Sequence, residues 1–218
     1  MPRIVSKLVY DFDELNEPAK EKARAWYRNG ALDFDWWEYV YDDAVLMGGL
    51  IGIEIGTKRG STSEPAIYFS GFSSQGDGAC FEGSYSYVAG GLRSLQRTAP
   101  ASRTLDGKRV ECKGNVELHE VAQKLQEVQR RHAYKLTATV RQRGSYVHSM
   151  CTEIEVDHAG GGRVSNEAEQ DITDALRGFM DWIYFRLDAE YEFQMSNEQV
   201  DASIKANEYE FNEDGSRA

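Results

Sequence analysis

The chain has 218 residues, of which 41% are hydrophobic, with 9 Phe, 12 Tyr and 4 Trp. This composition supports a folded core and argues against disorder over most of the chain. There is no apolar run of about 18 residues and no apolar leader after Met1, so we expect neither a membrane span nor a signal peptide. Three widely spaced cysteines favour a reduced, cytoplasmic protein.

The formal net charge is −11, and it is unevenly distributed. Residues 166–218 contain 4 Lys and Arg against 14 Asp and Glu, whereas residues 93–143 contain 12 against 5. Such asymmetry influences long-range steering and the choice of partners rather than the fold. We therefore expect an acidic C-terminal region and a basic central segment.

The first 48 residues predict two helices. Asn16 and Pro18 suit the start of a helix over 18–29, with Gly30 as its stop. A second helical period runs from Asp35 to the glycine pair at 48–49. Two short helices joined by a few residues favour a helical hairpin.

Residues 49–165 predict a sheet with an inserted helix. Residues 50–55 alternate like a strand, and the aromatic runs 66–72 and 80–88 predict a hairpin around a glycine-rich loop. The runs 134–143 and 145–157 predict a second hairpin. Between the hairpins, residues 115–132 predict a helix, while 93–113, with its Asp106-Gly107 pair, is expected to be a loop.

Residues 166–218 predict an acidic helical region, with a long helix over 166–195 and a short one capped near Ser196 that ends at Ala206. The whole pattern predicts one α+β domain over 1–218, in which an antiparallel sheet packs against a helical hairpin and a long C-terminal helix. Its regions are 1–48, 49–165 and 166–218.

The loop at 70–83 offers candidate ligands in Gln75, Asp77 and Glu82. Their oxygens could surround a small ligand, but the spacing is not that of a calcium loop. The alternative is a structural hairpin whose side chains hydrogen-bond the bend. Cys80, between two carboxylates, is a poor nucleophile because negative charge raises the pKa of a thiol.

The rest of the sequence contains no recognisable catalytic signature. It has no Walker loop, no Gly-x-Ser-x-Gly and no metal-type spacing among His119, His132, His148 and His158. Pairs of carboxylates such as Glu153 and Glu155 lack a partnered base. We therefore expect no enzymatic activity, no cofactor and no metal.

Three segments together resemble a family of small proteins carried by phages and prophages. They are residues 10–24 (YDFDELNEPAKEKAR), 69–83 (FSGFSSQGDGACFEG) and 204–215 (IKANEYEFNEDG). Members of that family are often labelled antitoxin of a toxin–antitoxin stability system. The resemblance implies a mobile-element protein that acts in the cytoplasm of a bacterial host, and it brings no catalytic residues.

Charge and resemblance together suggest a protein-binding inhibitor of a bacterial defence or toxin protein, similar in action to an anti-CRISPR protein or an antitoxin. Acidic side chains on a rigid helix would imitate phosphates and cover a basic nucleic-acid-binding surface of the partner. The candidate residues for this contact are Glu167, Glu169, Asp171, Asp174, Asp181, Asp188, Glu190 and Glu192.

Two alternatives remain open. One is a small-ligand-binding protein or enzyme centred on Gln75, Asp77 and Glu82 in the loop at 70–83. The other is direct nucleic-acid binding through 93–143, which the net acidity of the chain disfavours. The basic residues of 93–143 could equally fit against the acidic C-terminal helix of the same chain.

Overall fold

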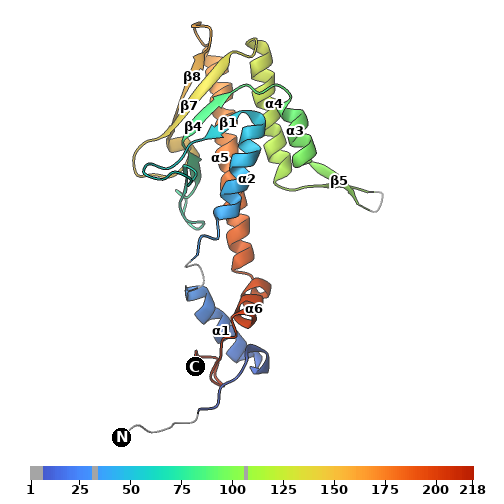
Figure 1. Ribbon diagram of the computed structural model, residues 1–218, viewed down its shortest axis with the longest axis vertical. Helices are drawn as coiled ribbons and strands as arrows, with labels where there is room; N and C mark the ends of the chain where they lie inside the picture. The colour runs from blue at the N-terminus through green and yellow to red at the C-terminus, as the bar shows by residue number, and fades with distance from the viewer. Residues whose placement is uncertain (1–6, 31–33, 106–107) are drawn as a thin grey trace. The chain divides into compact units, whose positions relative to one another are not determined.

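A computed structural model describes residues 7–30, 34–105 and 108–218 (Figure 1). The contacts of the chain group into two compact units, one made of residues 1–37 with 189–218 and the other of residues 38–188. The expectation of a single domain over the whole chain stays a prediction.

The smaller unit joins the two ends of the chain. It contains the short 3-10 helix η1 (Phe12–Glu14), α1 (Glu17–Gly30), α6 (Asn197–Ala206) and the last turns of α5 (Asn166–Gln194). The predicted caps are confirmed: Asn16 Oδ1 accepts the Ala19 amide at 3.0 Å and Ser196 Oγ accepts the Gln199 amide at 3.2 Å. Its core consists of Phe12, Leu15, Ala19, Ala23, Val200, Ile204 and Phe211.

A buried arginine links α1 to α6 inside this unit. Arg24 donates to both carboxylate oxygens of Asp201, at 2.6 and 2.8 Å, and also to Glu21. The hydrogen bond to Asp201 is the main cause that raises the pKa of the guanidinium above its ordinary value. Since a buried charge is tolerated only when it is paired, this contact ties the two helices together.

The larger unit is built around a four-stranded antiparallel sheet. The strands are β1 (Ile53–Ile55), β4 (Gly83–Ser86), β7 (Leu136–Gln142) and β8 (Thr152–His158), in the order β1-β4-β7-β8. A separate hairpin pairs β2 (Ile67–Phe69) with β3 (Ala79–Phe81). Both predicted hairpins are therefore confirmed.

Four helices accompany these strands: α2 (Glu38–Ile51), α3 (Gly91–Thr98), α4 (Asn115–Arg131) and most of α5. Helix α5 packs against the strands (Figure 1). The Phe179 ring lies edge-on to Phe81, at 5.8 Å between centroids. The α+β class and the long C-terminal helix are confirmed. No helix among the residues described is long and apolar enough to cross a membrane.

Four local predictions were wrong. Residues 50 and 51, predicted to begin a strand, lie at the end of α2, and β1 begins only at Ile53. Residues 93–113 are not a loop: they form the end of α3 and a ribbon of β5 (Ser102–Leu105) and β6 (Lys108–Glu111), while Asp106 and Gly107 lie outside the described residues. The run 80–88 divides at Glu82 into β3 and β4, which join different sheets. Residues 145–151 contain the 3-10 helix η2 (Ser149–Cys151), and β8 begins only at Thr152.

In all but the last case the physical reason is the same. Strands of three or four residues are too short to establish a hydrophobic period, so pairing partners rather than local pattern decide them. The helical hairpin predicted over residues 1–48 concerns α1 and α2. Helices α1 and α2 belong to different units, so their pairing stays a prediction.

Candidate functional site

The glycine-rich loop is closed by its own aspartate. Asp77 Oδ2 accepts the backbone amides of Ser73 and Ser74 at 2.9 and 2.6 Å. The loop is also held from outside, because the Tyr184 hydroxyl donates to Gly71 O at 3.3 Å. An aspartate that hydrogen-bonds nearby backbone amides is a turn-forming arrangement, so this geometry favours the structural role of Asp77.

The other two candidate ligands of the loop are used differently. Glu82 accepts from the Tyr68 hydroxyl and from the Gln142 amide, each at 3.3 Å, and so bridges β2 and β7. Gln75 is exposed at the tip of the loop. The two carboxylates thus already serve as acceptors within the protein, which weakens the hypothesis of a small-ligand site.

Cys80, in β3 directly after this loop, is fully buried. Burial is the main cause that raises the pKa of its thiol to about 11, and Glu82 adds to the rise, while a hydrogen bond with Thr152 opposes it. Because the thiolate is the nucleophile, a thiol with so high a pKa is a poor catalyst at neutral pH.

The acidic residues predicted on α5 do not all share one face. Glu167, Asp171, Asp174, Asp181 and Asp188 recur at spacings of four, three, seven and seven residues, which places them on one stripe of the helix. Gly178 and Phe185 continue the same stripe. Glu169 lies off it, Glu190 is buried, and Glu192 is exposed in the part of α5 that belongs to the smaller unit.

Helix α4 neutralises the N-terminal part of this stripe. Arg131 donates to Glu167 at 2.9 Å and to Asp171 at 2.5 Å, and Lys124 lies 3.5 Å from Asp174. The hydrogen bond with Asp171 is the main cause that raises the pKa of Arg131. Arg131 and Lys124 are therefore two basic residues of 93–143 that pair with the acidic C-terminal helix of the same chain. Among the described residues, the stripe carboxylates without an ion pair lie in its C-terminal half.

An open groove lies between α4 and α5 at this point. Its volume is about 300 Å³, and its lining residues are Glu117, Glu120, Val121, Lys124, Asp174, Ala175, Gly178, Asp181, Trp182 and Phe185. Gly178 lets the two helices approach closely, since a Cβ there would come within 3.1 Å of Val121. Phe185 projects from α5 with 61% of its surface exposed. The floor of the groove is therefore apolar.

The rims of the groove are acidic on both sides. Glu117 and Glu120 stand exposed on α4, facing Asp174 and Asp181 on α5, with Lys124 as the single cation of the lining. The sequence does not predict Glu117 and Glu120 as site residues, because only the packing of α4 against α5 brings them into one groove with Asp174 and Asp181. Asp174 is already paired with Lys124, so Glu117, Glu120 and Asp181 are the carboxylates that can accept a cationic, partly apolar group.

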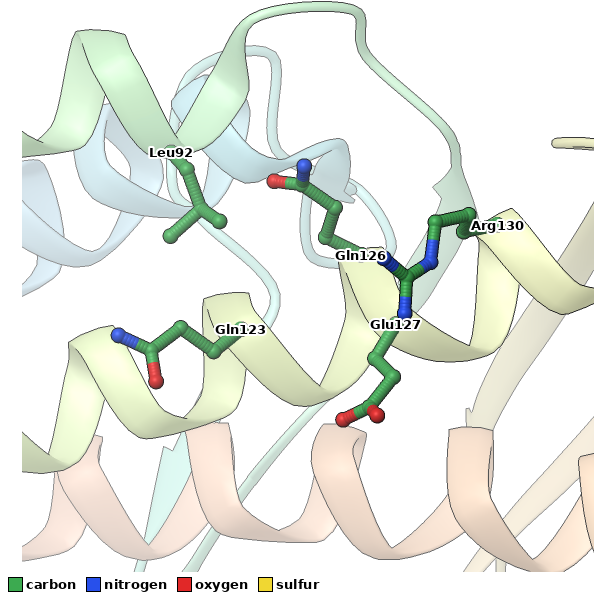
Figure 2. Close-up of a pocket in the computed structure, with 5 residues that line it drawn as sticks. All are labelled: Leu92, Gln123, Gln126, Glu127 and Arg130. Carbon is green, nitrogen blue, oxygen red and sulfur yellow. The ribbon is translucent and has the colours of Figure 1, made fainter.

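A second, smaller hollow lies between α3 and α4. Figure 2 shows Leu92 of α3 pointing toward α4, from which the side chains of Gln123, Gln126, Glu127 and Arg130 project. Its volume is about 190 Å³. Its two charges are of opposite sign, so it offers no comparable recognition chemistry for a charged partner.

Among residues 7–30, 34–105 and 108–218, no group of three or more His, Cys, Asp or Glu side chains is arranged to hold a metal ion. Carboxylates such as those of the groove can pair with organic cations. Side chains of lysine and arginine are the ones that proteins supply.

Comparison with known proteins gives a family but no activity. Residues 36–197 match the model of a family described as Domain of unknown function (DUF8835). The matched span includes the glycine-rich loop and the whole α4–α5 groove. No curated protein and no solved structure matches the chain.

Proposed function

The chain belongs to the DUF8835 family, and within the region that this family covers we propose that the α4–α5 groove binds a basic surface of a bacterial host protein and inhibits it. The partner is a defence or toxin protein whose basic surface binds nucleic acid. The inhibitor acts as an anti-CRISPR protein or an antitoxin would, by occupying that surface.

The observation that carries the proposal is the combination of charge and exposed aromatic surface in one groove. Carboxylates on both rims provide acceptors at the spacing of two packed helices, where lysine and arginine side chains that normally contact phosphates can pair. Phe185, which also lines the groove and has 61% of its surface exposed, supplies an apolar anchor beside them. Aromatic anchors at the centre of an interface typically dominate its binding energy.

The helix pair also holds these groups in fixed positions. The ion pairs of Arg131 and Lys124 join α4 to α5, and Trp182 donates its indole N–H to Gly114 O at 2.5 Å. A preorganised surface loses less conformational entropy when it binds. Unpaired acids such as Asp181 would in addition speed the encounter with a basic partner at low salt.

The test is capture of host proteins on the immobilised full-length chain. We expect a captured protein that binds nucleic acid, that is displaced by added duplex DNA or RNA, and that is released as salt rises. The variant E120K/D181K should weaken this capture by tenfold or more, because rim charges then repel the basic surface. Phe185→Ala should weaken it to a similar degree by removing the anchor.

A matched control reverses two exposed carboxylates outside the groove, in the variant E54K/D157K on β1 and β8. It changes the net charge by the same amount. If the control weakens capture as much as E120K/D181K, only the overall charge matters and the groove is not the binding site. If nucleic acid fails to displace the captured protein, the inhibitor proposal is wrong.

A further inference from the structure

The β5–β6 ribbon stands apart from the rest of the larger unit. Within residues 7–30, 34–105 and 108–218 its two strands pair only with each other, in the register Ser102–Glu111 to Leu105–Lys108. All four residues of β6 are exposed, including Val110, and Figure 1 shows the ribbon extending away from α3 and α4. An isolated two-stranded ribbon is only marginally stable in water, so its position away from any core calls for an explanation.

The ribbon and the helix before it are rich in cations. Residues 93–113 contain six Lys and Arg, which are Arg93, Arg97, Arg103, Lys108, Arg109 and Lys113. All six side chains are exposed. They represent nearly a quarter of the 25 basic residues in a chain whose net charge is −11.

These cations also differ from most others in the chain by their lack of acidic partners. Within the described residues, none of the six forms an ion pair, and Arg109 Nε instead donates to the Ser102 hydroxyl at 2.9 Å. By contrast, Arg141 and Arg143 on β7 pair with Glu155 and Glu153 at 2.8 and 2.6 Å. Unpaired exposed cations remain available to an external anion.

The strand register places the cations on both faces of the ribbon. Lys108 is paired with Leu105, and Leu105 lies two residues after Arg103 on β5. Arg103 and Lys108 therefore share one face of the ribbon. Arg109 lies on the opposite face, across from Thr104. A ribbon with cations on both faces fits between two walls of negative charge better than it fits a single flat acidic surface.

We propose that the β5–β6 ribbon, with the exposed arginines of α3, binds the phosphates of a nucleic-acid duplex. The major groove of B-form DNA admits a two-stranded β-ribbon, and phosphates line both of its walls. No base-reading side chain is needed, so the binding is electrostatic and independent of sequence. The proposal goes beyond inhibition through the α4–α5 groove and does not depend on it.

The two surfaces are compatible in one molecule. A partner that binds nucleic acid brings a duplex close to its own basic surface, and an inhibitor that also contacts that duplex gains effective concentration from the second contact. The acidic groove and the basic ribbon would then contact different components of one nucleoprotein complex.

The test uses the full chain alone with a short labelled DNA duplex and measures fluorescence anisotropy between about 50 and 200 mM salt. We expect sequence-independent binding whose affinity falls steeply with salt. The variant R103Q/R109Q should reduce the salt slope by about 2 and the affinity by roughly tenfold for each cation removed. The variant R93Q/R97Q should act in the same way.

The control is R141Q/R143Q, which removes two exposed arginines that are already paired with carboxylates. It should leave affinity and slope almost unchanged. The proposal is overturned if the chain does not bind the duplex at about 50 mM salt, or if the control loses as much affinity as R103Q/R109Q. It is also overturned if polyglutamate binds the ribbon more tightly than the duplex does, since the partner would then be an acidic protein. Because the partner protein is absent, failure here leaves inhibition through the groove intact.

Discussion

Replacement of Asp77 separates a structural role for the glycine-rich loop from a ligand-binding one. One carboxylate oxygen accepts both the Ser73 and the Ser74 amide. Asp77→Ala removes both hydrogen bonds, whereas Asp77→Asn keeps a neutral oxygen that can accept them. The difference between wild type and Asp77→Asn therefore measures the effect of the carboxylate charge. The difference between Asp77→Asn and Asp77→Ala measures the effect of the hydrogen bonds.

The magnitude follows from the two bonds. A hydrogen bond to a charged group contributes about 1.5–3 kcal/mol, and the partial exposure of the loop reduces this value by solvent screening. We expect Asp77→Ala to make opening of the loop easier by about 1–3 kcal/mol in total and Asp77→Asn by about half as much. Since 1.4 kcal/mol corresponds to a factor of ten, protection of these two amides should fall about fivefold or more in the alanine variant.

The assay is native-state hydrogen exchange of the Ser73 and Ser74 amides by NMR. Gln75→Ala is the control, because Gln75 is exposed at the same loop and its replacement should change stability by less than about 0.5 kcal/mol. Unchanged protection in Asp77→Ala would refute the reasoning. The carboxylate would then be free for an external ligand, and the small-ligand hypothesis would regain its strongest residue.

Three further predictions concern packing and pairing. Gly83→Ala should lower the Tm by about 5 °C or more, because the added Cβ would lie 2.0 Å from the carbonyl oxygen of Glu54 on β1. A smaller decrease of the Tm in thermal unfolding would show that β1 and β4 separate easily at this point. Asp201→Ala should cost about 2–4 kcal/mol in urea unfolding by leaving Arg24 with only its local acidic neighbours, and adding Arg24→Met should recover most of this loss. Cys80 should resist alkylation at pH 8, where a thiol of pKa about 11 is ionised in about one molecule in 1,000, while exposed Cys151 reacts; equal rates would contradict its burial.

The helices illustrate what local sequence rules can determine. The ends of α4, α5 and α6 fall within three residues of their predicted limits, since capping groups and apolar periodicity act over a single turn. The same rules failed for β5 and β6, whose four-residue strands have no apolar face. They also missed the division of the run 80–88, because a change of sheet is decided by distant strands.

The candidate site was predictable only in part. Its acidic helix followed directly from the charge distribution, and the spacing of Asp174 and Asp181 on that helix is a property of the chain itself. The groove depends on α4, which contributes Glu117 and Glu120 from more than 50 residues away in sequence. Two other residues predicted to contact a partner are less available for that contact, because Glu167 is paired with Arg131 and Glu190 is buried.

By itself the sequence determined the α+β class, the positions of the longer helices, both main hairpins and the excess of acid near the C-terminus. These depend on short-range periodicity, capping and composition, which act without knowledge of distant residues. Only the tertiary structure decided which carboxylates remain unpaired, where Phe185 emerges between them, and which cations stand alone on the β5–β6 ribbon. Charges act through distances in space, and helix and strand packing sets those distances.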